Sequence, residues 1–349
     1  MLKKNKAVIL SYVIMIALTA VISLLLIAAA GSSIGDALSG FGRAVAGSSY
    51  SIAEVLVKAV PLTLCGLGVA IGFHTGFTNI GAEGQFYIGA VVTTALGTFC
   101  GDLPGFVLLP LCFIAGFIAA GIWAVVPGFL RAKYGVSEVI NTIMFNYIAI
   151  CIVGILLQTS LKDPANYFPQ SAYMPESMSL PLLIRGTRLH AGLIVALVCA
   201  ALVYILVWRT KAGFDMRAVG LNSRACKCSG IPVAKSILLS AMLSGGLAGL
   251  AGVCEITGLQ HRLMSGISPG YGYLAIITAL LGRNHPVGII LASIGIAALQ
   301  VGAQGMQRSA GVPNSIADII RAVVVLLILA RHMLEKKLKK QFKKQGGKA

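Results

Sequence analysis

Three polar side chains, Asn79, Glu83 and Gln85, stand close together in a glycine-rich stretch at residues 72–90 of an otherwise apolar sequence. A carboxylate in hydrocarbon costs roughly 2.5–3.5 kcal/mol on insertion scales, so such groups usually face a cavity or a partner. If this stretch is helical, Asn79 and Glu83 share a face and Gln85 is turned away. The residue types favour recognition of a polar solute at membrane depth, and therefore a transport site.

A second polar set follows farther along the chain. Glu138, Thr142 and Asn146 recur every four residues, and Asn141 lies one turn from Glu138. These side chains could line a pathway together. Alternatively, they hydrogen-bond neighbouring helices, each bond contributing about 0.6 kcal/mol, with Glu138 as a helix-start carboxylate at the inner membrane face. The spacing leaves both interpretations open.

Two common catalytic motifs are missing from the sequence. It contains no G-x-x-x-x-G-K-[ST] and no H-E-x-x-H, and its five histidines are far apart. The eight cysteines are scattered without metal-binding spacing, which favours buried thiols. We therefore predict no enzyme activity and no cofactor in this chain. Active transport would need an ion gradient or ATP bound to partner subunits.

The elements that position these residues are expected to be membrane helices. Hydrophobic residues make up 57% of the 349 positions, charged residues make up 11%, and the mean hydropathy is +0.88. These values lie far from those of soluble domains and predict an all-α polytopic membrane protein. We expect roughly eight to ten transmembrane helices in a single membrane domain, residues 1–349. The candidate spans are about 7–30, 51–72, 84–100, 105–130, 138–158, 191–208, 235–256, 271–282, 286–303 and 315–331.

The basic residues predict the orientation. If the N-terminus lies inside the cell, 20 of the 28 Lys and Arg residues fall in inner segments and seven in outer segments. An excess of Lys and Arg is typical of cytoplasmic loops. Both termini are therefore expected in the cytoplasm, with a basic cytoplasmic tail at 332–349. The first apolar run is too long for a signal peptide, so we expect it to stay as a span. Anionic lipid at the inner face accounts for the net charge of +17, and no nucleic-acid partner is expected.

The seventh candidate span, 235–256, has a small residue at every fourth position. This pattern predicts a seam where another helix backbone approaches closely. Glu255 at the end of this span, and the pair Asp318 and Arg321, are expected to form structural ion pairs. The residues of the seam are Ser236, Ser240, Ser244, Ala248 and Gly252.

The inner segment 209–234 is too long for a tight turn. Asn222 is a good N-cap, and Gly230 and Pro232 would end a short helix that begins after it. A short basic and apolar helix across the inner face is suited to docking a cytoplasmic partner. The apolar patch at 218–221 favours this interpretation over a solvated loop.

Five stretches match one family in register: 79–85, 137–147, 217–222 leading to 230–231, 244–252, and 270–273 with 279–282. With these motifs, the chain resembles membrane permeases of ATP-binding-cassette (ABC) importers, in the branched-chain amino acid/ribose/nucleoside permease superfamily. It is most similar to nucleoside (simple-sugar-like) permeases that work with basic-membrane-protein-type lipoproteins. The resemblance covers most of residues 55–330.

The resemblance implies roles for two sets of residues. The segment 209–234 would be a coupling loop that fits a groove on an ATPase subunit, with contributions from Arg217, Gly220, Leu221, Asn222 and Gly230. The translocation path would include Asn79, Glu83, Gln85, Asn141, Asn146, Tyr271 and Tyr273. Two positions depart from the nucleoside members: His74 stands where many have Arg, and Leu274 where they often have Asp.

The expected function is a permease subunit of an ABC importer in a bacterial-type cell membrane, for nucleosides or a related small polar solute. Its partners would be ATPase subunits, a second permease that is a related but distinct chain, and an extracellular substrate-binding lipoprotein that delivers ligand near the outer loop 159–190. The alternative is a stand-alone ion-coupled secondary transporter. A membrane-embedded enzyme is the weakest interpretation, because no catalytic cluster is visible.

Overall fold

The computed structural model describes residues 17–18, 21–29, 31–165, 167–313, 315–316, 319–320, 322–323 and 326–327. Most of the expected spans at 7–30 and 315–331 lie outside these residues, as do Asp318, Arg321 and the tail at 332–349. Among the described residues all named elements are helical, which confirms the all-α prediction. Their order is α2 (Ile34–Ala46), α3 (Ser49–Thr75), α4 (Ala82–Phe99), α5 (Gly105–Tyr134), α6 (Glu138–Gln158), η1 (Glu176–Met178), α7 (Gly192–Arg209), α8 (Lys211–Leu221), α9 (Ser223–Cys228), α10 (Val233–Glu255), η2 (Ile256–Gln260), α11 (Tyr271–Leu281) and α12 (Pro286–Ala310).

Six helices in the described part of the chain are long and apolar enough to cross a membrane: α3, α5, α6, α7, α10 with η2, and α12. Val21–Ala29 and Ile34–Ala46, bent by 119°, would together make a seventh. Two further expected spans form helices that do not qualify alone. The first turn of α4 contains the polar Glu83 and Gln85, and α11 has only 11 residues.

The described contacts divide the chain into two compact units, residues 1–55 with 298–349 and residues 56–297. In the smaller unit, α2 packs closely on the end of α12: a Cβ on Gly302 would overlap the ring of Phe41, and the Ser309 hydroxyl donates to the Asp36 carbonyl oxygen at 3.0 Å. Ser33 caps α2 by accepting a hydrogen bond from the Asp36 N–H. No span is predicted from the sequence at 31–50, and α2 is an amphipathic helix of 13 residues that a search for apolar runs does not detect.

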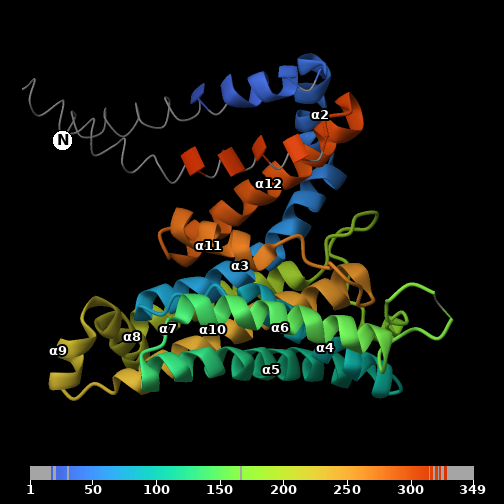
Figure 1. Cartoon of the computed structure of the whole chain (residues 1–349). Helices are drawn as coiled ribbons and strands as arrows, with labels where there is room; N and C mark the ends of the chain where they lie inside the picture. Colours follow the sequence, from blue (N-terminus) through green and yellow to red (C-terminus); the bar gives the residue numbers. More distant parts are fainter. Residues whose placement is uncertain are drawn as a thin grey trace, which may run out of the picture. The chain divides into compact units, whose positions relative to one another are not determined.

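In the larger unit, α10 is the central helix and packs on α4 and α5 (Figure 1). Its small residues allow this close approach: a Cβ on Gly249 would overlap the methyl group of Ala120, and a Cβ on Gly252 would overlap the Phe86 carbonyl oxygen. The predicted seam is therefore confirmed. In contrast, α6 is the more exposed helix of this unit, with 22% of its most apolar 18 residues buried against 72% for α10.

Two irregular segments lie at opposite ends of α7. The 159–190 loop precedes it and the α8–α9 pair follows it, and 18 helical residues separate their ends by about 27 Å. Figure 1 shows α8 and α9 projecting at one end of this unit. The predicted helix after Asn222 is confirmed as α9, because the Asn222 Oδ1 accepts from the N–H groups of Arg224 and Ala225, both at 3.1 Å. The preceding helix α8, capped by Thr210, has no clear sequence signal.

Candidate functional site

The chain is not helical between α3 and α4, so Asn79 does not share a helical face with Glu83, whereas Glu83 and Gln85 lie in the first turn of α4. Gly76 has a φ of +74°, which ends α3, and the chain then runs back beside the last turn of that helix. The Phe77 N–H donates to the Gly72 carbonyl oxygen at 3.0 Å. Irregular backbone at membrane depth requires partners from the protein, because lipid offers no hydrogen bonds.

Asn79 and Gln85 form a reciprocal amide pair, although a helical face would have separated them. Asn79 Nδ2 donates to Gln85 Oε1 at 2.8 Å, and Gln85 Nε2 donates to Asn79 Oδ1 at 3.1 Å. Asn79 Nδ2 also donates to the Ser244 hydroxyl on α10 at 2.8 Å, and Asn79 Oδ1 accepts from the Gly81 N–H at 2.9 Å. Ser244 is therefore both a seam residue and a polar partner.

Glu83 joins the starts of two helices. It lies in the first turn of α4, and its Oε2 accepts from the Gly272 N–H at the start of α11 at 2.7 Å. Ser268 forms a side-chain hydrogen bond with Glu83 and also accepts from the Tyr271 N–H at 3.0 Å. Helix N-termini carry unsatisfied N–H groups and partial positive charge, so an acidic side chain is favourable there.

Asn146 and Thr142 on α6 bind the interrupted segment from the other side. Asn146 Oδ1 accepts from the Gly84 N–H at 2.8 Å, and its Nδ2 donates to the Ile80 carbonyl oxygen at 2.9 Å. Thr142 accepts from the Ile80 N–H at 3.3 Å. Both side chains therefore replace backbone hydrogen bonds that the break removes from α3 and α4.

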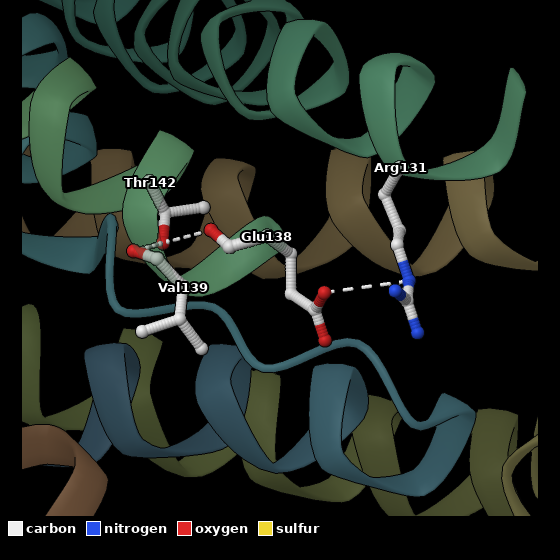
Figure 2. Close-up of polar contacts among 4 residues, drawn as sticks. All are labelled: Arg131, Glu138, Val139 and Thr142. Atoms are coloured by element: carbon white, nitrogen blue, oxygen red, sulfur yellow. Dashed lines mark hydrogen bonds and ion pairs between the residues drawn. The ribbon is translucent and has the colours of Figure 1, made fainter. Parts of the chain in front are cut away.

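Figure 2 shows the beginning of α6, where Glu138 faces Arg131 of α5. Glu138 Oε2 lies 3.3 Å from Arg131 Nε, and the Thr142 hydroxyl donates to the Glu138 carbonyl oxygen at 2.7 Å. Glu138 is thus a helix-start carboxylate with an ion-pair partner, which is the structural one of the two interpretations left open by the sequence.

The other predicted path residues differ in their placement. Tyr271 is buried and packs on Phe86, with ring centroids 5.9 Å apart, whereas Tyr273 is 39% exposed and its hydroxyl lies 3.4 Å from Asn146 Nδ2. Asn141 stands apart, and its Nδ2 has no hydrogen-bond partner among the described residues. The structure therefore brings Asn79, Gln85, Glu83 and Asn146 into one junction, which Tyr273 connects to the surface.

We call this junction, formed by Asn79, Glu83, Gln85, Asn146 and Ser244, the polar junction. All five side chains are buried. In many transporters, discontinuous helices whose ends point at the solute form the transport site. The polar junction can offer amide and carboxyl hydrogen bonds.

The predicted coupling-loop residues differ in their contacts and in their exposure. Gly220 lies against the end of α3, because a Cβ there would overlap the His74 carbonyl oxygen. The Arg217 Nε is buried. Asn222 and Gly230, which has a φ of +78°, begin and end the α9 turn. Leu221 is 88% exposed.

The sequence gives no indication that the 159–190 loop is fastened to the segment 256–264. The Ser171 N–H donates to the Leu263 carbonyl oxygen at 2.9 Å, Met174 donates to His261 at 2.7 Å and Leu180 donates to Thr257 at 2.8 Å, all through backbone groups. These bonds cover the π-helical turn η2, a rare geometry that often occurs at functional sites. We call this contact the loop clasp.

Acid is expected to open the loop clasp. Burial and the nearby His261 lower the pKa of His190 from 6.5 to about 4, and burial lowers the pKa of His261. His190 Nδ1 accepts from the Gly192 N–H at 3.1 Å, so His190 must stay neutral to keep this bond. The clasp is therefore fully stable above pH 6.5 and loses up to about 3 kcal/mol as the pH falls toward 4. Hydrogen exchange of residues 159–190 across this range measures the effect.

His190→Asn, which cannot titrate, is the matched variant for this prediction. Its exchange should depend much less on pH between 6.5 and 4, even if the clasp is weaker at every pH. The same pH dependence in both proteins would show that His190 does not control the clasp.

Comparison with known proteins decides the family. Residues 51–329 match the family described as branched-chain amino acid transport system / permease component. The chain belongs to this permease family. It is 36% identical to the guanosine ABC transporter permease protein NupP of Bacillus subtilis (strain 168), over 89% of this chain and 90% of that protein. No solved structure matches the chain significantly.

Two other relatives have different named solutes. The permease is 36% identical to the glucose ABC transporter permease protein TsgB13 of Haloferax volcanii, over 83% of this chain and 78% of that protein. It is 32% identical to the nucleoside ABC transporter permease protein NupB of Lactococcus lactis subsp. cremoris, over 84% and 83%. These matches confirm the family resemblance. They also confirm the prediction of a multi-pass transport subunit of the cell membrane, in a family of permeases and not of enzymes.

Proposed function

We propose that this permease is the membrane subunit of an ABC importer for nucleosides or a related uncharged polar solute. It would form the translocation path around the polar junction, together with a second permease. ATPase subunits would bind on the cytoplasmic side and a substrate-binding lipoprotein on the outside, with both chain termini in the cytoplasm and anionic lipid at the basic inner face. The observation that carries the proposal is the meeting of the starts of α4 and α11 at Glu83, in a chain whose relatives are named nucleoside and guanosine permeases.

The chemistry of the polar junction supports an uncharged cargo. The N-termini of α4 and α11 would attract an anion, but the Glu83 carboxyl group already occupies the N–H of Gly272. The other groups are amides, a serine hydroxyl and the phenol of Tyr273, which suit the hydroxyl groups and ring nitrogens of a nucleoside. A negatively charged cargo would be repelled by Glu83.

The α8–α9 end of the unit supports the docking of an ATPase subunit. Leu221 is 88% exposed and Phe214 is 57% exposed, so both present apolar surface at the end opposite the loop clasp. Phe214 also lines a groove of about 610 Å³, together with Lys211, Asp215 and Ile231. Exposed apolar side chains with charged neighbours are typical of protein interfaces.

Affinity purification from gently solubilised native membranes tests this function. The tagged permease should bring an ATPase, a second permease and a lipoprotein with it, and guanosine or another nucleoside should stimulate ATP hydrolysis. A permease recovered alone, and active in liposomes under an ion gradient, would contradict the proposal and favour secondary transport.

Leu221→Asp is expected to weaken ATPase binding about tenfold or more, because an interface that buries a leucine gains about 1.5–3 kcal/mol from it. The measurement is the amount of ATPase that copurifies at increasing salt and detergent. The substitution should not unfold the permease, since Leu221 is almost fully exposed.

Leu221→Met is the matched control, because methionine keeps an apolar side chain of similar volume. It should copurify the ATPase as well as the original protein does. Equal recovery with Leu221→Asp would place the docking surface elsewhere.

A further inference from the structure

Helix α8 touches the C-terminal end of α3, where the irregular segment that leads to α4 begins. A Cβ on Gly220 would overlap the His74 carbonyl oxygen and lie 3.1 Å from the Gly76 nitrogen. The contact is therefore backbone against backbone, with no flexible side chain between. Gly76 begins the irregular segment that leads to Asn79, so a displacement of α8 acts directly on the chain that enters the polar junction.

The His74 side chain connects the same point to the turn between α11 and α12. Its Nε2 lies 3.0 Å from the carbonyl oxygen of Asn284, which makes the ring nitrogen the donor. Its ring also packs edge-on against Trp208 at the end of α7, with centroids 5.3 Å apart. His285 packs against the same Trp208 ring at 5.2 Å.

The turn that His74 contacts has one defined conformation. Arg283 and Asn284 have φ values of +53° and +56°, in the left-handed region that is costly for residues other than glycine. The Asn284 N–H donates to the Ala279 carbonyl oxygen at 2.8 Å, which closes the end of α11. A turn held in this way moves as a unit with α11.

The charged neighbour of His74 comes from α8. Arg217 precedes Gly220 by one helical turn, so both lie on the same face of α8, and Arg217 interacts electrostatically with His74. His285 is the other titratable group that acts on His74. The Arg217 Nε is buried without a hydrogen-bond partner among the described residues. Arg217 and His74 are therefore sensitive to any shift of α8 against α3.

These contacts form a closed ring. His74 binds Asn284 at one end of α11, Gly272 at the other end binds Glu83, and Glu83 leads back through the irregular segment to Gly76 beside His74. The 11 residues of α11 separate the two ends by roughly 16 Å. A rigid helix fastened at both ends transmits a displacement along its length.

We propose that His74 is a positioning residue that fastens the α11–α12 turn to the contact between α3 and α8. Movement of α8 would then reach α4 and α11 together. This inference rests on the proposed function, because it takes α8 as the element moved by the ATPase. It assigns His74 to coupling and not to cargo recognition. The hydrogen bond and ring contacts of His74 go to α7 and to the α11–α12 turn.

The test compares His74→Ala with His74→Gln in the full complex, since the glutamine amide can donate to the Asn284 carbonyl oxygen. Hydrogen exchange of residues 271–285 is measured with and without ATP, together with ATPase copurification and guanosine-stimulated hydrolysis. In the original complex, ATP should change this exchange. His74→Ala should reduce the change about fivefold, the effect of one lost hydrogen bond, with unchanged ATPase recovery. His74→Gln should restore most of it.

Three results would overturn the inference. The first is that ATP changes the exchange of residues 271–285 as much in His74→Ala as in the original complex, and the second is that this change is the same in His74→Ala and His74→Gln. The third is a shift in the guanosine concentration for half-maximal stimulation while the exchange still responds normally to ATP. The last would make His74 a cargo contact. If His74→Ala is not recovered as a complex, His74→Asn, whose amide is one carbon shorter than that of glutamine, replaces it. Failure of the proposed function is distinguishable, because the original permease would then copurify no ATPase.

Discussion

Glu83→Gln is expected to reduce nucleoside uptake about fivefold to tenfold while the permease still folds and assembles. Glutamine keeps an oxygen that can accept from the Gly272 N–H, but it removes the charge that favours the N-termini of α4 and α11. Charge-assisted hydrogen bonds are roughly twice as strong as neutral ones, which corresponds to about 1 kcal/mol here. Uptake into proteoliposomes that contain the complete importer measures the effect.

Two variants make the Glu83 result specific. Glu83→Ala leaves the Gly272 N–H unpaired, so it should also lower thermal stability, by about 1–3 kcal/mol. Glu176→Gln makes the same chemical change at an exposed position in η1 and should leave stability and assembly unchanged. If uptake by Glu83→Gln equals that of the original protein, Glu83 holds the helices together without contributing to transport.

Gly220→Ala is expected to uncouple ATP hydrolysis from uptake. The added methyl group would overlap the His74 carbonyl oxygen, and backbone atoms cannot move aside as a side chain does. Overpacking of this kind costs about 1–3 kcal/mol, so α8 should shift away from α3. We expect hydrolysis to continue in the complex while guanosine uptake per ATP falls about tenfold or more. Uptake and phosphate release are measured in the same proteoliposomes.

Gly154→Ala is the matched control for this substitution. Gly154 lies on α6, and a Cβ there would meet no atom within 4 Å. It should therefore show normal uptake per ATP. Normal coupling in Gly220→Ala as well would mean that the contact between α8 and α3 does not transmit movement.

Local sequence patterns predicted most helices well. The apolar runs at 138–158 and 191–208 correspond closely to α6 (Glu138–Gln158) and α7 (Gly192–Arg209). Asn222 marked the start of α9, and the small residues of 236–252 marked the seam of α10. These features depend on residues a few positions apart, so they can be recognised without knowledge of the fold. The helices α2 and α8 were missed because they are short and carry mixed polar and apolar residues.

The order of the residues alone identifies an all-helical membrane permease and singles out the polar side chains within its apolar segments. How those side chains are used depends on the tertiary packing. Asn79 pairs with Ser244, 165 positions away, and Glu83 with Gly272, 189 positions away. Likewise His74 meets the turn at Asn284 and the backbone of Gly220. Helix formation follows from neighbouring residues, whereas the backbone groups released by a break in a membrane helix must find partners wherever packing brings them.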